Sequence, residues 1–314
     1  ILEKEEAMKI EKKLWITLFV FGLFAICFSG WIFSQSTTRE KLFWDNTIQC
    51  ETKELAEGEI KSENIALPED FDIPRSILFK TTHTIAEVWL DGEKIYEYGN
   101  EADAPGFMKT PGSCWHIVDI PGDSAGKNLE VRIVPVYEGY YGNEVSLVYG
   151  TQGDCNLKIL TDSLGTLVIS CGILFAAVIC LLLYCGAARR KRSDKTEAKI
   201  EIFLNLGFFS LLVAVWTLVQ CGFLQFLIPD GRTLYFVDYF SFFLFPVPFN
   251  FLLYDICKSR YHKGALILSI LYLANMAVDV LLQCTGIIDI SRLLSVTHVI
   301  MVANAVYTVV LILY

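Results

Sequence analysis

A polar stretch of about 125 residues interrupts the apolar runs of this chain and constrains its fold more than any short motif. One apolar run, 14–33, precedes the stretch, which spans about 34–161. Five more follow it with short loops between them: 164–185, 202–228, 234–254, 265–283 and 293–314. A helix that crosses a bilayer needs about 20 apolar residues. The pattern therefore predicts six membrane spans, with a water-soluble domain inserted between the first and the second.

The net charge of −9 is concentrated in the polar stretch. Residues 35–161 hold 11 Lys/Arg and 22 Asp/Glu, a net of −11, so the rest of the chain carries the remaining +2. A surface this acidic repels phosphate backbones and anionic head groups. We therefore expect no nucleic-acid partner for this domain.

Lysine and arginine predict the orientation of the spans, because short cytoplasmic loops are enriched in them. Four lysines precede the first run, six basic residues separate the second from the third, and three separate the fourth from the fifth. The alternate loops hold only Arg232 and Arg292. The N-terminus is therefore predicted to be cytoplasmic and residues 35–161 extracellular, in the cell membrane.

The first run is predicted to be a retained anchor, because its apolar core exceeds the roughly 7–15 residues of a cleaved signal. The chain begins at Ile1 and ends within an apolar run at Tyr314. We expect it to be a fragment of a longer protein.

Alternating apolar and polar residues predict β-strands in the polar stretch, first at 86–90 and 129–134. Other candidate strands are 94–98, 113–120 and 144–149. Asp91 and Gly92 predict a two-residue hairpin, because tight turns need positive φ angles. With no helical period in this region, the pattern favours an antiparallel sandwich or jelly roll. Residues 51–70 are predicted only as a loop or an edge strand.

Aromatic residues are dense in this domain and suggest a ligand site. A ring with a polar tip can stack on a sugar or another amphipathic ligand, although such rings more often fill a core or rest at the membrane interface. Glycines in 137–142 lift their neighbouring rings out of regular strand packing. The candidate contacts for a small-molecule or carbohydrate ligand are Trp115, Tyr137, Tyr140 and Tyr141.

Three cysteines lie in the polar stretch: Cys50, Cys114 and Cys155. An extracellular domain permits disulfides, and the odd count leaves one cysteine over. Cys50 and Cys155 lie near the two ends of the domain, so we predict that they pair. The four histidines are scattered and no CxxC pair exists, so we expect neither a metal site nor a cofactor.

Polar residues and prolines mark the helical part. Pro246 and Pro248 predict a kink in the run 234–254, since proline removes a helix hydrogen bond. Asp238 and Asp279 lie near the predicted outer ends of their runs. They could belong to a buried polar network that a signal rearranges. The alternative, which we expect, is contact with water at the outer interface.

The order of these parts resembles the seven-transmembrane receptors with diverse intracellular signalling modules, a bacterial family. The resembling segments are 88–99, 109–113, 148–150, 204–210 with Trp216, and the Pro246/Pro248 helix. The resemblance implies a cytoplasmic tail and anchor at 1–34, an extracellular jelly-roll sensor at 35–161 and a helical bundle at 162–314. The family has seven helices after its sensor domain, where this chain has five. It also implies a cytoplasmic effector in cis, often a diguanylate cyclase and sometimes a histidine kinase or phosphatase, and leaves homodimerisation open.

Three other classes compete with a receptor. A transporter or channel subunit would need broken helices and charges at mid-membrane, and only the proline-interrupted run fits. A membrane enzyme would need acid–base or metal-binding residues at bundle depth, and no GxSxG, HExxH or phosphate loop occurs. A carbohydrate-binding surface protein would need a single anchor. The layout therefore favours a membrane receptor.

Overall fold

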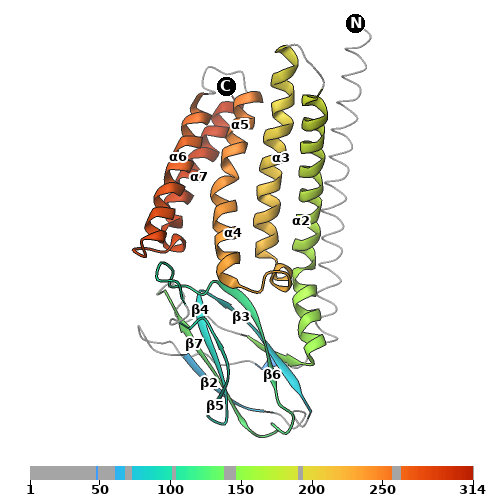
Figure 1. Cartoon of the computed structure of the whole chain (residues 1–314), viewed down its shortest axis with the longest axis vertical. Helices are drawn as coiled ribbons and strands as arrows, with labels where there is room; N and C mark the ends of the chain where they lie inside the picture. Colours follow the sequence, from blue (N-terminus) through green and yellow to red (C-terminus); the bar gives the residue numbers. More distant parts are fainter. Residues whose placement is uncertain are drawn as a thin grey trace.

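The computed structural model describes residues 47–48, 61–67, 73–100, 104–137, 146–189, 194–256 and 263–313. A β region lies at one end of a set of long helices (Figure 1). Five of the described helical segments are long and apolar enough to cross a membrane. The predicted run 14–33 lies outside the described residues, so its role as an anchor stays a prediction.

Two four-stranded antiparallel sheets make up the β region. In spatial order, the first sheet contains β1 (Thr47–Ile48), β8 (Leu147–Gly150), β3 (Arg75–Thr82) and β6 (Ser113–Ile120). The second contains β2 (Lys61–Ala66), β7 (Asn128–Pro135), β4 (Thr84–Leu90) and β5 (Glu93–Tyr98). β2 falls within the stretch predicted as a loop or an edge strand, and it is an edge strand.

The predicted hairpin is confirmed. Asp91 and Gly92 join β4 to β5 with φ angles of 46° and 84°, the pair of positive values that a type I′ turn requires. The predicted strand 113–120 coincides with β6, and 129–134 lies within β7. The last predicted strand is shorter than expected, because β8 begins at Leu147.

A continuous apolar core lies between the two sheets. Alternate residues of β4, such as Val88, face alternate residues of β3 and β6, such as Phe79 and Ile120, all of them buried. β3 departs from this alternation, with four consecutive buried residues from Ser76 to Phe79. Leu78 points away from the core and packs under helix α2, so β3 is covered on both faces. Its pattern therefore gave no period-two signal.

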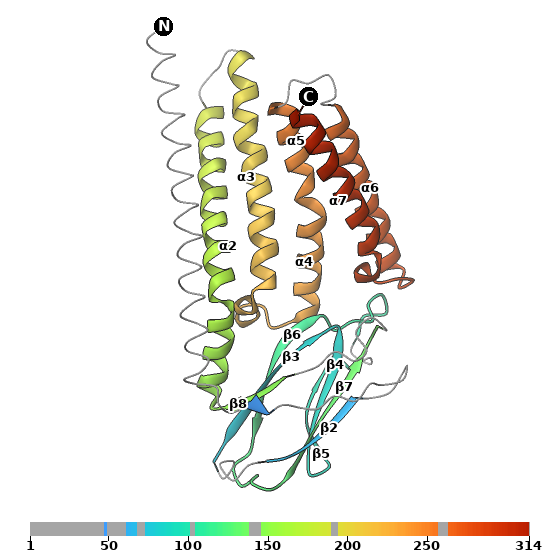
Figure 2. The ribbon, with the colours of Figure 1, turned by 180° about the vertical axis from the view of Figure 1, so that it is seen from behind.

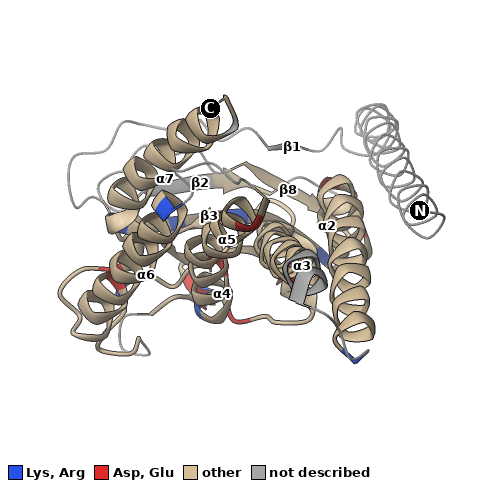
Figure 3. Ribbon diagram, turned by 90° about the horizontal axis from the view of Figure 1, so that it is seen from above, with Lys and Arg blue, Asp and Glu red and all other residues tan. Residues whose placement is uncertain are grey.

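The helices stand side by side in chain order, as the views from behind and along their axes show (Figures 2 and 3). They are α2 (Gln152–Ala188), α3 (Asp194–Gln220), the short 3₁₀ helix η4 (Gly222–Phe226), α4 (Gly231–Leu244), α5 (Pro246–Ile256), α6 (Lys263–Cys284) and α7 (Ile290–Leu313). Their ribbons carry few charged residues (Figure 3). The helix ends opposite the β region, at Ala188, Ile256 and Lys263, are called the far ends below.

Two helices differ in length from their predicted spans. α2 begins at Gln152, twelve residues before the run at 164, because Thr151 and Asp154 form a capping box that starts the helix on the β region. Its first turns bury Cys155 and Ile159 against the first sheet. α3 ends at Gln220 instead of continuing to 228, and η4 follows it where the chain meets the β region.

The helical assignment is interrupted at the prolines, because α4 ends at Leu244 and α5 begins at Pro246, although Phe245 between them keeps helical φ and ψ angles, so the kink itself stays a prediction. The expectation that Asp279 contacts water is wrong. Its side chain is only 3% exposed and accepts a hydrogen bond from Asn275 Nδ2 at 2.8 Å. Asn275 also donates to Thr297 Oγ1 on α7 at 2.9 Å, so packing of α6 against α7 closes this position to solvent.

Candidate functional site

The β region and the helices meet at a buried junction. On the β side it contains His83, residues 104–115 and Tyr137; on the helix side it contains residues 219–239 and 283–291. Met108 is 2% exposed and packs among Tyr235, Tyr239 and Ile290. Burying one such side chain contributes about 1.5–3 kcal/mol. The two parts therefore share a small apolar core at the junction.

Gln283 is the centre of a hydrogen-bond network across the junction. Its Nε2 donates to Asp289 Oδ1 at 2.8 Å and to the main-chain oxygen of Phe107 in the β region. Its Oε1 accepts from Ile290 N at 2.9 Å and from the Tyr235 hydroxyl at 3.3 Å. The amide is 1% exposed and all its bonding capacity is used. Such fully satisfied buried networks hold their members in one arrangement.

Tyr137 adds a second link from the β region to residues 283–290, where α6 ends and α7 begins, called the α6–α7 corner below. Its hydroxyl donates to Asp289 Oδ2, and the Arg292 guanidinium lies over its ring at 5.8 Å. Burial raises the pKa of Tyr137, and the hydrogen bond to Asp289 raises it further. Tyr137 therefore stays protonated and serves as a donor at any physiological pH.

Gln225 closes the edge of the first sheet. Its Oε1 accepts from Trp115 N at 2.7 Å, and its Nε2 donates to Trp115 O at 2.6 Å. β6 is the last described strand of that sheet, so within the described residues one side of its backbone has no neighbouring strand. The amide replaces the missing strand at one residue and fixes η4 to the sheet.

Two glycines allow the backbones to approach closely at the junction. A Cβ on Gly112, whose φ is +87°, would collide with the main chain of Gly231 at the start of α4. A Cβ on Gly222 would collide with the indole of Trp115. The contact between the β region and the helices is therefore too tight for side chains at these two points.

His83 occupies the centre of the β side. Its φ of 53° is left-handed, and its side chain is 5% exposed. Its Nδ1 lies 2.9 Å from Thr110 Oγ1, and its ring lies 5.6 Å from Tyr137 and 5.7 Å from Tyr235. Burial lowers the pKa of His83 to about 4, and the nearby Asp289 carboxylate offsets part of that effect. The imidazole is therefore neutral at pH 7.

Cys114 and His116 resemble a nucleophile and its base, because the sulfur lies 3.5 Å from Nε2. Burial raises the pKa of the Cys114 thiol to about 11 and lowers the pKa of His116 to about 3. Both His116 nitrogens are occupied, by Thr81 Oγ1 at 2.7 Å and the Tyr96 hydroxyl at 2.9 Å. A neutral buried thiol is a poor nucleophile, so this pair packs the sandwich interior instead of performing catalysis.

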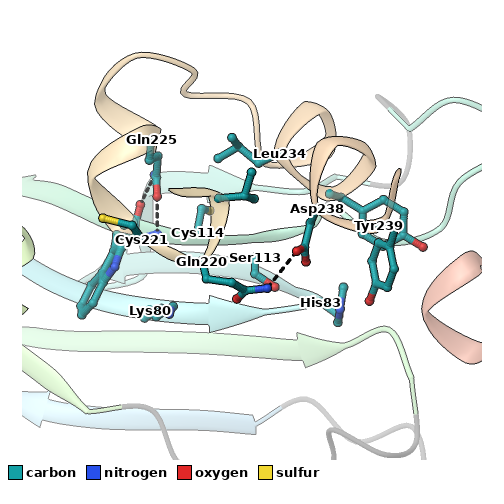
Figure 4. A pocket seen from close by; sticks show the side chains of 14 residues that line it. Lys80, His83, Ser113, Cys114, Gln220, Cys221, Gln225, Leu234, Asp238 and Tyr239 are labelled. Atoms are coloured by element: carbon teal, nitrogen blue, oxygen red, sulfur yellow. Dashed lines mark hydrogen bonds between the residues drawn. The ribbon is translucent and has the colours of Figure 1, made fainter. Parts of the chain in front are cut away.

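A cavity of about 80 Å³ lies in the junction (Figure 4). Residues of the first sheet line one side and residues at the ends of α3, η4 and α4 line the other. Lys80 and Asp238 supply the charges, and Gln220 donates from Nε2 to Asp238 Oδ1 at 2.9 Å. The remaining lining residues include His83, Ser113, Cys114, Trp115, Gln225, Leu234, Tyr235 and Tyr239.

The structure places two of the four predicted ligand contacts in this junction. Trp115 lines the cavity, and Tyr137 lies beyond it, in ring contact with His83. Tyr140 and Tyr141 lie outside the described residues, so their role stays a prediction. Sequence reasoning missed Gln225, Gln283 and Asp289, whose only signal is their polarity beside apolar runs.

The predicted disulfide also stays a prediction, because Cys50 lies outside the described residues. Cys155 lies buried in the first turn of α2, where its Sγ approaches Ser76 O at 3.7 Å. Among the described residues, no group of three or more His, Cys, Asp and Glu could hold a metal ion.

The fold and the junction define a class: a protein with a β region and five helices long and apolar enough to cross a membrane, suggesting a multi-pass membrane protein. No family model, curated protein or solved structure matches this chain. Its function must therefore be argued from the junction.

Proposed function

We propose that this chain is the sensing part of a membrane receptor. Its β region receives a small-molecule or carbohydrate ligand outside the cell, and the helices transmit the event to a cytoplasmic effector in cis. The observation that carries the proposal is the junction, where buried side chains of both parts form one hydrogen-bond network and line one cavity. A ligand that prefers one arrangement of this junction shifts the population of helix arrangements.

Three separate links support mechanical coupling. Gln225 ties η4 to β6, Gln283 ties the α6–α7 corner to Phe107, and α2 runs without interruption from the first sheet to its far end. Transmission requires a contiguous element whose equilibrium both sites influence. A typical coupling free energy is about 1–3 kcal/mol, comparable to one or two of these buried hydrogen bonds.

The layout also agrees with the resemblance to the seven-transmembrane receptors with diverse intracellular signalling modules. The described residues form eight strands in two four-stranded sheets, with spatial orders β1-β8-β3-β6 and β2-β7-β4-β5, as in a jelly roll. Arg189 lies at the far end of α2, opposite the β region, in keeping with an extracellular β region. For the effector we propose the diguanylate cyclase that is frequent in that family.

Orientation is tested by labelling whole cells with a membrane-impermeant thiol reagent. Because the chain has ten native cysteines, labelling is measured as the gain over the parent chain, and a Ser193→Cys variant is expected to show no gain until the cells are opened. The same experiment with Asp123→Cys, in an exposed turn of the β region, supplies the matched control and is expected to label from outside. Labelling of Ser193→Cys on intact cells would reverse the topology and end the receptor proposal.

Coupling is tested by hydrogen exchange on the whole chain in lipid nanodiscs. Gln283→Ala removes the centre of the junction network, which lies about 30 Å along α6 from Lys263. We expect altered amide exchange at the far ends of α5 and α6. Gln152→Ala, an exposed glutamine at the start of α2, is the control and should leave exchange unchanged. A change confined to the α6–α7 corner would contradict coupling.

A further inference from the structure

We propose that Asp279 is a proton-binding site whose proton controls how closely α6 and α7 pack. This site goes beyond the sensor function proposed above and does not depend on it, since its ligand is a proton. Asp279 lies five residues before α6 ends at Cys284, so it is about 7.5 Å along the helix axis from the end that faces the β region. Its proton therefore exchanges with water on the side of the β region.

The Asp279 carboxyl is buried beside a single neutral partner. The residue is 3% exposed, and Asn275 Nδ2 donates to its Oδ2 at 2.8 Å. Stabilising an ionised carboxylate by hydrogen bonds takes about two or three donors. An isolated ionised carboxylate is so costly to bury that such a group takes up a proton instead. Asp279 is therefore a neutral acid while α6 and α7 are closed.

The charged and titratable groups around this part of α6 lie on α4, α5, α7 and α6 itself. They are Arg232, Tyr235, Asp238 and Tyr239 on α4, Tyr254 and Asp255 on α5, Lys263, Tyr272 and Cys284 on α6, and Asp289, Arg292, His298 and Tyr307 at the start of α7 or on it. Arg292 lies over the Tyr137 ring at 5.8 Å, and Asp289 accepts from Tyr137 and Gln283. Among the described residues no cation pairs with Asp279, so its negative charge would be uncompensated.

The pair of helices around Asp279 is polar inside and apolar outside (Figures 1 and 2). The buried positions include Ser269, Tyr272, Asp279 and Gln283 on α6 and Thr297 and Asn304 on α7. The exposed positions include Ile267, Val278 and Leu281 on α6 and Val299, Val302 and Val306 on α7. Lipid supplies no hydrophobic driving force between two helices, so packing and polar contacts must close such a pair.

Few polar contacts close this pair near Asp279. Asn275 on α6 donates to Thr297 Oγ1 on α7 at 2.9 Å and uses its other hydrogen on Asp279. Further along α7, Asn304 Oδ1 is buried without a hydrogen-bond partner. A closed pair held in this way tolerates a neutral acid at Asp279 better than an anion.

Release of the proton leaves a charge that the closed pair cannot solvate. The O–H bond of the carboxyl breaks, its electron pair stays on the carboxylate oxygen, and the proton passes to water. Water reaches the carboxylate only if α6 and α7 separate. The closed pair thus binds the proton more tightly than the open pair, so its stability is present at low pH and is lost as the pH rises. His83 and His116 do not contribute to this change above pH 7, because their pKa values are lowered to about 4 and about 3.

Infrared spectroscopy of the whole chain in nanodiscs tests proton binding. A protonated carboxylic acid has a C=O stretching band separate from those of carboxylates and amides. At pH 7 we expect such a band in wild type, its loss in Asp279→Asn and its displacement in Asp279→Glu, which keeps the acid. Asp123→Asn, in an exposed turn, is the matched control and should keep the band. An unchanged band in both Asp279 variants, or loss of the band only in Asp238→Asn, would overturn the assignment.

The distance between spin labels on α6 and α7, measured by electron paramagnetic resonance, tests control of packing. Val278 and Val296 are both exposed, and each lies about 9 Å along its helix from the end at the β region. We expect the distance between genetically encoded labels there to lengthen from pH 7 to pH 9 in wild type and to stay constant in Asp279→Asn. Loss of the acid band without lengthening, or equal lengthening in Asp279→Asn, would overturn the control of packing by this proton. Neither measurement involves a ligand of the β region, so failure here leaves the proposed sensor function standing.

Discussion

Gln225 pairs its side-chain amide with both main-chain groups of Trp115, at 2.7 Å from Trp115 N and 2.6 Å to Trp115 O. The two residues are 110 positions apart in the sequence, one in the 3₁₀ helix η4 and the other in the edge strand β6. The helical part thus supplies the hydrogen-bond partners of both main-chain groups of Trp115. The two parts are therefore held together at this residue.

Gln225→Ala should lower the free energy of unfolding by about 1–3 kcal/mol, since it leaves a buried donor and a buried acceptor of Trp115 unpaired. Thermal unfolding in nanodiscs, followed by tryptophan fluorescence, measures the effect. Gln225→Glu keeps the shape but loses the donor, so it should also destabilise. Equal melting temperatures for wild type, Gln225→Ala and the exposed-site control Gln152→Ala would show that the pairing contributes nothing.

Two glycine variants test the tight contact between the loop at Gly112 and the start of α4 at Gly231. Gly112 and Gly92 have almost the same left-handed φ, +87° and +84°, but a Cβ on Gly112 meets Gly231 while a Cβ on Gly92 meets nothing within 4 Å. Both alanine variants incur about 1–2 kcal/mol of backbone strain. Gly112→Ala should lose more stability than Gly92→Ala, because α4 must also move away. If chemical denaturation gives the two variants equal losses in free energy of unfolding, the close contact between Gly112 and Gly231 does not restrict residue 112.

Acid should weaken the protein through its two buried histidines. The pKa values of His83 and His116 are lowered to about 4 and about 3, below the usual 6.5, because burial disfavours the charged form. Between these values and 6.5 the unfolded chain binds more protons, so stability is complete above about pH 6.5 and falls as the pH drops. At pH 5 the loss is about 2 kcal/mol per histidine.

Variants assign this pH dependence. His83→Asn, in which asparagine tolerates the left-handed backbone, and His116→Gln should each flatten the dependence of melting temperature on pH between 7 and 5. Gln152→Ala, at an exposed site that does not titrate, is the control and should leave the slope as in wild type. Slopes that do not change in His83→Asn and His116→Gln would assign the acid sensitivity to other groups.

The sequence predicted elements whose determinants are local. The Asp91–Gly92 turn, the strand β6 and the interruption before Pro246 depend on neighbouring residues, and five of the predicted apolar runs correspond to helical segments. β3 was not predicted as a separate strand, because α2 covers Leu78 on its outer face and removes the alternation. The extension of α2 to Gln152 was missed because its first turns pack on that sheet.

The junction could not be read from the sequence for a different reason. Gln283 and Phe107 are 176 positions apart, and Tyr137 and Asp289 are 152 apart, so no short pattern links them. Aromatic density drew attention to Trp115 and Tyr137, whose role as ligand contacts stays a prediction, but it suggested an exposed binding face. In the structure Tyr137 is buried and Trp115 is half-buried against helices, because apolar helix ends cover this side of the β region.

The central claim is that a change in the β region reaches the far ends of the helices. Double electron–electron resonance, which measures the distance between two spin labels, tests it most directly. Genetically encoded spin labels at Ala188 and Lys263, both exposed at the far ends, avoid the ten native cysteines. Tyr137→Phe removes one hydroxyl that crosses the junction, while Tyr96→Phe removes one inside the sandwich. We predict that the distance distribution shifts in Tyr137→Phe and matches wild type in Tyr96→Phe. Superimposable distributions in all three proteins would contradict the account.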